Sequence, residues 1–253
     1  GTLRPVNTGI GTGFEFQNFS NEALTWESST QVNAGVSFTA FKSKLSATIE
    51  VYNKVSKDFL FQFAPNDAVT GGISPGSVTP PWVNIGEMQN KGIDITLGYS
   101  DEIANRITWN STLTVSHYKN NVNRLLGDTP ILGQVELLDA PKNISFTREG
   151  QALGLFYGYV VEGLFRSLDD IQGAPIQFGR PFENALFGTT WLGDVKFKDI
   201  NGDGVVDGND RTVIGNPHPD FTFGFQNSFS WKNFDLSIFL QGSYGNDIFN
   251  AVG

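Results

Sequence analysis

Residues 220–244 read DFTFGFQNSFSWKNFDLSIFLQGSY, and the two alternating halves of this stretch decide the fold. The apolar residues of the first half occupy odd positions; they are Phe221, Phe223, Phe225, Phe229 and Trp231. After Lys232-Asn233 the apolar residues occupy even positions; they are Phe234, Leu236, Ile238, Leu240 and Tyr244. Alternation with period 2 predicts two β-strands, each with one apolar and one polar face. A two-residue turn at Lys232-Asn233 places both apolar sets on the same side, with Trp231 opposite Phe234 and Phe225 opposite Leu240.

The length of these strands indicates what the apolar side faces. Strands in soluble domains usually run for about 5–6 residues, and these alternate for roughly twice that length. From Phe221 to Trp231 the chain spans about 33 Å, which a tilt of about 40° reduces to about 25 Å, the apolar height of an outer-membrane barrel. Aromatic residues at both ends of the hairpin match the interfacial girdles of such barrels. A soluble β-sandwich, whose inner faces also alternate, remains an alternative for this hairpin alone.

Residues 30–40 and 45–51 predict a second long hairpin around a turn at Lys42-Ser43, because both segments alternate in the same way. The cross-strand pairs expected from this turn are Ala40 with Leu45 and Val36 with Ile49. These pairs again place the two apolar sets on one face.

A third hairpin is predicted at 93–99 and 107–115, joined by a short link at 101–105. Short connections therefore alternate with long ones, of which the first covers 64–82. Barrels have short periplasmic turns and long extracellular loops, so this rule favours a barrel over a sandwich. Residues 120–218 are then expected to form one large extracellular excursion, with an extra hairpin from Phe156 to Phe165.

Composition narrows the function classes. The chain has 253 residues, a formal net charge of −9 and no cysteine, which excludes disulfides, zinc–thiolate sites and a thiol nucleophile. Nucleic acid is an unsuitable partner, because phosphate binding needs clustered Lys and Arg. No apolar run approaches the ~20 residues of a membrane helix.

The three hairpins and the alternation of short and long connections together predict an all-β fold, an antiparallel transmembrane β-barrel segment with long extracellular loops.

The strongest local motif is the acidic loop 199–210, DINGDGVVDGND, inside the predicted excursion. Its side-chain oxygens fall at loop positions 1, 3, 5, 9 and 12, with glycine at position 6, which is the spacing of a 12-residue EF-hand-like Ca²⁺ loop. The expected ligands are Asp199, Asn201, Asp203, the carbonyl of Val205, Asp207 and Asp210. Because residues 211–217 have no helical pattern, we expect a structural Ca²⁺ clip rather than a switch. A metal-free turn rich in Asp and Asn is the alternative.

Catalytic chemistry is not supported by the sequence. Neither a nucleophile elbow nor an acid/base carboxylate pair is recognisable, so we expect no enzyme activity and no catalytic cofactor. Three aromatic residues on predicted loops are weak candidates for stacking on a ligand; they are Trp82, Tyr157 and Trp191. Packing between loops is the alternative role for each of them.

Several segments resemble the SusC/RagA-type TonB-dependent outer-membrane transporters. Residues 84–94, NIGEMQNKGID, match the N-x-G-x-x-x-N-K-G-hydrophobic-acidic signature of that family. Similar matches occur at LTWE of 24–27, at GDVKFKD of 193–199, at RTVIGNP of 211–217, at NFDL of 233–236 and at YGNDI of 244–248. These matches cover most of residues 20–250 in the order of the family.

The resemblance implies a 22-stranded barrel with an internal plug in the outer membrane of a Gram-negative, Bacteroidota-type cell. It also implies coupling to the TonB complex, a SusD-like surface lipoprotein as lid, contact with outer-membrane lipid, and import of oligosaccharides or peptides. Residues 1–253 are expected to be a late, partial portion of the barrel, with the plug and the TonB-binding box outside them. No ligand-binding residue of the family carries over to this chain.

A second class of function remains open from the sequence: a soluble, calcium-stabilised carbohydrate-binding or adhesive β-sandwich. Detergent dependence separates the two, because only the transporter needs a membrane environment. A glycoside hydrolase would need a carboxylate pair that the sequence does not offer.

Overall fold

The computed structural model describes residues 3–7, 12–16, 20–62, 81–103, 106–127, 130–137, 140–180, 182 and 189–250. The chain divides into two compact units. The first unit comprises residues 1–129, 148–151 and 221–242, and the second comprises 130–147, 152–220 and 243–253. Within the described residues, no helix is long and apolar enough to cross a membrane.

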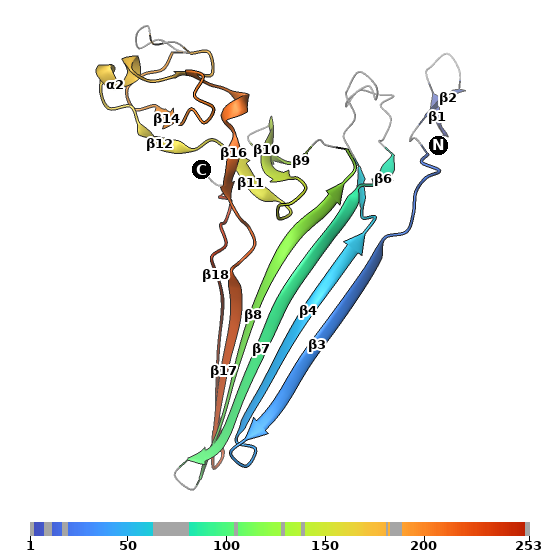
Figure 1. The fold of residues 1–253 in the computed structure, drawn as a ribbon, viewed down its shortest axis with the longest axis vertical. Coiled ribbons are helices and arrows are strands. Elements are labelled where there is room, and N and C mark those ends of the chain that lie inside the picture. The colour runs from blue at the N-terminus through green and yellow to red at the C-terminus, as the bar shows by residue number, and fades with distance from the viewer. Residues whose placement is uncertain are drawn as a thin grey trace. The chain divides into compact units, whose positions relative to one another are not determined.

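A six-stranded antiparallel sheet of long strands dominates the first unit (Figure 1). The strands, in spatial order, are β18 (Phe234–Tyr244), β17 (Phe221–Trp231), β8 (Ile107–Leu125), β7 (Gly86–Ile103), β4 (Leu45–Lys57) and β3 (Ser28–Ala40). The turns at 41–44 and 232–233 and the facing ends of β7 and β8 lie at the same end of this sheet (Figure 1). All three predicted hairpins are therefore confirmed.

The register agrees with the alternation in the sequence. Ala40 lies opposite Leu45, as the turn requires. One apolar row crosses five strands, each member directly opposite the next: Val36, Ile49, Ile95, Val115 and Phe223. The neighbouring row on the other face is small and polar: Ser37, Thr48, Thr96, Thr114 and Gly224. At the 232–233 turn, the rings of Trp231 and Phe234 stack with centroids 6.3 Å apart.

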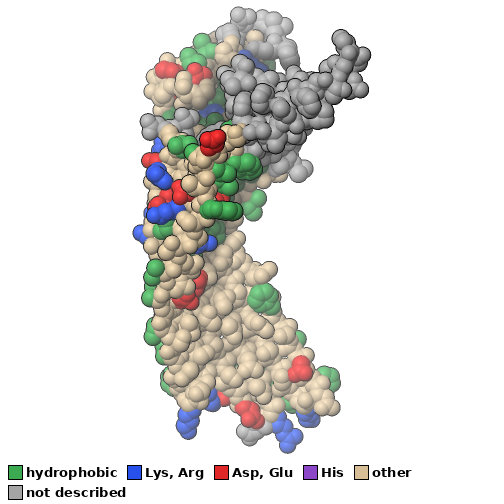
Figure 2. Space-filling view, turned by 90° about the vertical axis from the view of Figure 1, so that its right-hand side faces the viewer, with side chains coloured by type: hydrophobic (Ala, Val, Ile, Leu, Met, Phe, Trp, Pro, Cys, Tyr) green, Lys and Arg blue, Asp and Glu red, His purple; other side chains and the backbone are tan. Residues whose placement is uncertain are grey.

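The sheet is a single layer with two unlike faces. Its apolar face stays uncovered within the described chain, since Val36 is 58% exposed and Leu240 56% exposed. Figure 2 shows a broad surface of the sheet made mainly of uncharged polar side chains and backbone, with hydrophobic side chains mostly along its edges. Phe239 departs from the alternation, because it is an exposed aromatic residue at an odd position of β18. The sandwich alternative is wrong, since it requires the apolar residues to meet across two stacked sheets.

Strands β7 and β8 are longer than their apolar alternation predicts. Gly86–Asn90 of β7 pair with residues 120–125 of β8, and Asn120 Nδ2 donates to Asn90 Oδ1 over 2.8 Å. The long connection to β17 therefore covers 126–220 rather than 120–218. The alternation of apolar residues does not indicate this extension, because both of its faces carry polar residues.

The second unit consists of short strands. Its largest sheet has the order β16 (Thr212–Gly215), β11 (Leu155–Gly158), β10 (Ala140–Thr147), β9 (Ile131–Leu137). Two small pairs accompany it: β12 (Val161–Leu164) with β14 (Val195–Phe197), and β13 (Ile176–Gln177) in parallel with β15 (Val205–Val206). The helices among the described residues of this unit are α2 (Leu168–Gln172) and the 3₁₀ turn η1 (Gly208–Asp210). The expected hairpin from Phe156 to Phe165 is wrong, because β11 pairs with β10 and β16 whereas β12 pairs with β14.

The first unit also contains two short strand pairs: β1 (Leu3–Asn7) with β2 (Thr12–Phe16), and β5 (Leu60–Gln62) with β6 (Trp82–Asn84). Most of the predicted long loop 64–82 lies outside the described residues. Its last residue, Trp82, belongs to β6 rather than to a loop.

Candidate functional site

The polar face of the six-stranded sheet carries an open hollow of about 390 Å³. Its lining residues are Gln31, Glu50, Tyr52, Lys54, Asn90, Asp94 and Tyr118. Glu50 lies directly opposite Asp94, and like charges in this position repel each other. Asn33 Nδ2 donates to Glu50 Oε1 over 2.6 Å and offsets part of that repulsion. The hollow thus offers carboxylates, amides and phenol rings to a polar ligand.

The segment Asn90-Lys91-Gly92 of β7 runs beside this hollow, and its three residues have different surroundings. Asn90 bonds Asn120 across the strands. Lys91 is exposed on the opposite, apolar-side face. Gly92 lies opposite Tyr52, where a Cβ on residue 92 would overlap the Tyr52 ring. Strand packing therefore explains Asn90 and Gly92 of the family-like N-K-G signature, but not the exposed Lys91.

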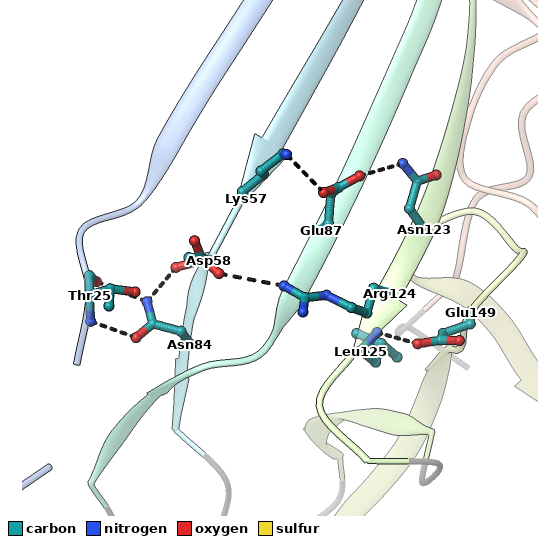
Figure 3. A network of polar contacts seen from close by, with 9 residues as sticks. All are labelled: Thr25, Lys57, Asp58, Asn84, Glu87, Asn123, Arg124, Leu125 and Glu149. Atoms are coloured by element: carbon teal, nitrogen blue, oxygen red, sulfur yellow. Dashed lines mark hydrogen bonds and ion pairs between the residues drawn. The ribbon is translucent and has the colours of Figure 1, made fainter. Parts of the chain in front are cut away.

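Asn84 fastens three segments together at the end of the sheet away from the short turns (Figure 3). Its Nδ2 donates to the carbonyls of Thr25 over 2.9 Å and Asp58 over 2.6 Å, and its Oδ1 accepts from Thr25 N over 2.8 Å. Glu27 in turn accepts from Leu60 N over 2.6 Å. The two family-like segments 24–27 and 84–94 thus meet in space.

Charged side chains continue this network across the strands (Figure 3). Lys57 and Glu87 form an ion pair at 3.5 Å, and Asn123 donates to Glu87 over 2.9 Å. Arg124 pairs with Asp58 at 3.7 Å. The network holds the strand ends from which the long connections depart.

Ile85 and Gly86 complete the motif beside Asn84. Ile85 is buried, with 1% of its surface exposed. A Cβ on Gly86 would overlap the carbonyl oxygen of Arg124, so only glycine permits this close approach of β7 and β8.

The acidic loop of the second unit folds around its own side-chain oxygens. Asp199 accepts from Gly202 N over 2.6 Å and from Gly204 N over 2.8 Å. Gly204, at loop position 6, has a φ of +85°, as a sharp turn there requires. Asn201, Asp203 and Asp207 each accept from the backbone N–H two residues on. Val205 lies on β15, and Val206 after it is fully buried as the anchor of the loop.

Asp210 closes the loop from inside. Its buried carboxylate accepts from Asp207 N over 2.7 Å and Ile200 N over 2.8 Å. The hydrogen bond from the Asp207 backbone is the main cause of a lowered Asp210 pKa. The loop lies between β14 and β16, so no helix flanks it, as expected. Within the described residues, no three His, Cys, Asp or Glu side chains group closely enough to hold a metal ion.

Arg211 is a structural residue that the sequence analysis did not identify. Its guanidinium donates to the carbonyls of Asn143 and Tyr157 and lies 4.5 Å from the centroid of the Tyr157 ring. Phe146 stacks on the same ring at 4.7 Å. Tyr157, a candidate for ligand stacking, therefore has a packing role between strands of the second unit.

The other two aromatic candidates belong to different units. Trp191 stacks on Phe182 with centroids 5.6 Å apart, inside the second unit. Trp82 is half exposed and belongs to the first unit. Ligand contact through Trp82, Tyr157 or Trp191 stays a prediction.

Two further family-like segments meet in the second unit. Asp247 N donates to Asn216 O and Asp247 Oδ2 accepts from Asn216 N, both over 2.7 Å. A Cβ on Gly215 would approach Asp247 Oδ2 to 2.9 Å. The segments 211–217 and 244–248 are thus joined by reciprocal hydrogen bonds.

Comparison with known proteins agrees with this arrangement. The family model described as TonB dependent receptor-like, beta-barrel, matches residues 2–146. TonB-dependent receptor P3 of Formosa agariphila is 30% identical over 239 residues, which cover 94% of this chain and 22% of that protein. TonB-dependent receptor SusC of Bacteroides thetaiotaomicron is 24% identical, covering 90% of this chain and 20% of that protein.

Solved structures show the same fold. The RagAB peptide importer in its closed-closed state matches with a TM-score of 0.68 and 18% identity, over 97% of this chain and 24% of that one. The chain spans under a quarter of the length of these proteins. The sequence relatives are receptors rather than enzymes, in agreement with the prediction that this chain is not an enzyme. With a family model matched over more than half of its residues, the chain belongs to the TonB-dependent receptor β-barrel family.

Proposed function

We propose that this chain forms part of the wall of an outer-membrane, TonB-dependent importer. The observation that carries the proposal is the single-layered sheet with an uncovered apolar face and a polar opposite face. In a soluble protein an apolar face of this size would be covered. Lipid covers it in an outer-membrane barrel, where lipid-facing and lumen-facing residues alternate along each strand.

The ends of the sheet support an orientation in the membrane. Trp231 and Phe234 stack beside the 232–233 turn, and Phe221 and Tyr244 mark the other ends of the same strands. Aromatic residues of barrels gather at the two membrane interfaces. Because barrels have short periplasmic turns and long extracellular loops, the short turns face the periplasm and the connection 126–220 forms the extracellular excursion.

The transported ligand is an oligosaccharide or a peptide, and a SusD-like surface lipoprotein closes over it as a lid. The hydroxyl-lined polar face and the hollow around Glu50 and Asp94 suit polar ligands that exchange hydrogen bonds with a wall. Relatives support the same class, since one is SusC and another is a peptide importer. Membership of the family supports coupling to the TonB complex as part of this proposal.

We also propose that the loop 199–210 binds one structural Ca²⁺. Asp199, Asn201, Asp203, the Val205 carbonyl, Asp207 and Asp210 would hold it, because hard oxygen donors at this spacing suit Ca²⁺. The side-chain oxygens would have to turn toward the ion from the backbone N–H groups that they accept from in this structure. The ion would stabilise a segment with a small core of its own. Limited proteolysis with and without Ca²⁺ tests this: wild-type protein should resist cleavage at 195–215 only with Ca²⁺, and Asp203→Ala should lose that protection. Equal resistance of the wild type in both conditions would contradict a metal site.

Import is tested in the native cell. Deleting the gene should abolish growth or uptake on one class of labelled oligosaccharide or peptide, and the full-length protein should fractionate with the outer membrane. Complementation with wild type should restore uptake, whereas a protein that purifies folded and monomeric without detergent would overturn the proposal. Co-purification of a lipoprotein with the tagged importer tests the lid.

A further inference from the structure

On β7 and β8 the apolar face gives way to lysines on the side away from the short turns, while β3 and β4 keep Val32 and Val55 on that side. Val51 of β4 lies opposite Ile93 of β7, which is the last aliphatic pair of the band on these strands. Two residues further along each strand, Asn53 lies opposite Lys91, and Lys91 lies opposite Lys119 of β8. Because side chains two residues apart share a face, both lysines stand on the face of the apolar band.

Lys91 and Lys119 form a directly opposed pair of like charges. The Cβ atoms of such a pair are about 4.5–5.5 Å apart, and like charges there destabilise a sheet. Both side chains are exposed, and neither takes part in an ion pair within the described residues. The pair therefore repels itself unless an anion lies between the two ammonium groups.

Carboxylates near this pair are engaged elsewhere. Glu87, further along the same face of β7, pairs with Lys57 and accepts from Asn123. Glu50 and Asp94 line the hollow on the opposite face of the sheet. The sheet thus places the acid pair Glu50 and Asp94 on its polar face and the lysine pair Lys91 and Lys119 on its apolar face.

We propose that Lys91 and Lys119 together bind the phosphate of a lipid headgroup at the extracellular margin of the apolar band. Two residues along a strand tilted by about 40° rise about 5 Å, which carries the ammonium groups from the hydrocarbon edge to the headgroup layer. Basic side chains at this level attract anionic lipids. On the same face Gln89 Nε2 donates to Asn53 Oδ1 over 2.8 Å, and this bond leaves the Asn53 Nδ2 group to donate to a phosphate oxygen. The inference rests on the membrane placement under Proposed function but adds a lipid site to it.

Spin-labelled lipids test the site on the full-length protein reconstituted in phosphatidylcholine vesicles. Electron paramagnetic resonance measures how strongly the protein restricts labelled phosphatidic acid relative to labelled phosphatidylcholine. A lysine near an anionic surface contributes about fivefold to binding. We expect a preference for phosphatidic acid that falls by about this factor in K91Q or K119Q and approaches unity in the double variant.

The matched control is Lys54→Gln, which removes a lysine of β4 on the polar face of the sheet, opposite Asn90. This variant should keep the wild-type preference, and inorganic phosphate added at constant ionic strength should not abolish it. Folding of each variant is checked by its restriction of labelled phosphatidylcholine.

Four outcomes overturn the lipid site: no preference in the wild type, a preference kept in the double variant, an equal loss in K54Q, or full displacement by inorganic phosphate. A wild-type protein that restricts neither lipid would instead refute the membrane placement itself.

Discussion

The ring of Tyr52 lies across Gly92 on the polar face of the sheet, with the two residues directly opposite each other on β4 and β7. A methyl group at residue 92 has no room there, because it would overlap the ring carbon Cζ. Gly92→Ala should therefore destabilise the full-length protein by about 1–3 kcal/mol, the usual cost of overpacking. Thermal unfolding in detergent measures this change.

The matched control is a double-mutant cycle with Tyr52→Ala. Once the ring is removed, the second substitution at Gly92 should cost little, because the overlapping atoms are gone. An equally large loss in the Tyr52→Ala background would show that the strain at Gly92 has another source.

Asn84 should be needed to hold the segment before β3. Asn84→Ala removes its hydrogen bonds to both backbone groups of Thr25 and to the Asp58 carbonyl, at about 0.5–1.5 kcal/mol per bond. We expect faster protease cleavage at 20–27, mapped by mass spectrometry on the full-length protein. Asn33→Ala, which removes two exposed bonds, to Glu50 and from Gln31, should leave that cleavage rate unchanged.

The long strands were predictable because their apolar residues alternate strictly and their turns are short. Val36–Ile49 and Ala40–Leu45 follow once the turn near Lys42 is placed, since a register slip of one residue would move every apolar side chain to the wrong face. The same local rule gave the two-residue turn at 232–233.

Pairing between distant segments was not predictable. The short strands β11 and β12 lie close in sequence, yet they join different sheets, and no local pattern identifies a partner strand. Arg211 and Asn84 act through bonds to backbone groups far away in sequence, which leave no periodic signal. The acidic loop was identified because its spacing is entirely local.

The ion pair of Asp170 and Lys196 should make the second unit sensitive to extreme pH. Their atoms lie 2.9 Å apart, and this hydrogen bond lowers the Asp170 pKa and raises the Lys196 pKa. A lowered acid pKa stabilises the folded state above the ordinary Asp pKa of about 4 and loses that effect as pH falls through the folded value. A raised Lys pKa stabilises the folded state below the ordinary Lys pKa of about 10.4. This stabilisation is lost as pH rises through the Lys pKa of the folded state.

Proteolysis of the 160–200 region across pH measures this effect. Asp170→Asn should increase cleavage equally throughout the neutral window, and its difference from wild type should vanish in strong acid. A difference that persists at a pH where Asp170 is protonated would show that the side chain acts sterically rather than through its charge.

Neighbouring residues of β18 offer a direct test of which face meets lipid. Ile238 is 44% exposed on the apolar face near the middle of the strand, and Ser237 stands on the opposite face. Ile238→Lys should lower the free energy of unfolding by about 2–4 kcal/mol, because it places a charge near the bilayer midplane. Ser237→Lys adds the same charge toward a watery lumen and should change stability little. Unfolding in lipid vesicles by denaturant measures both variants, and equal costs for the two would mean that the apolar face does not lie in hydrocarbon.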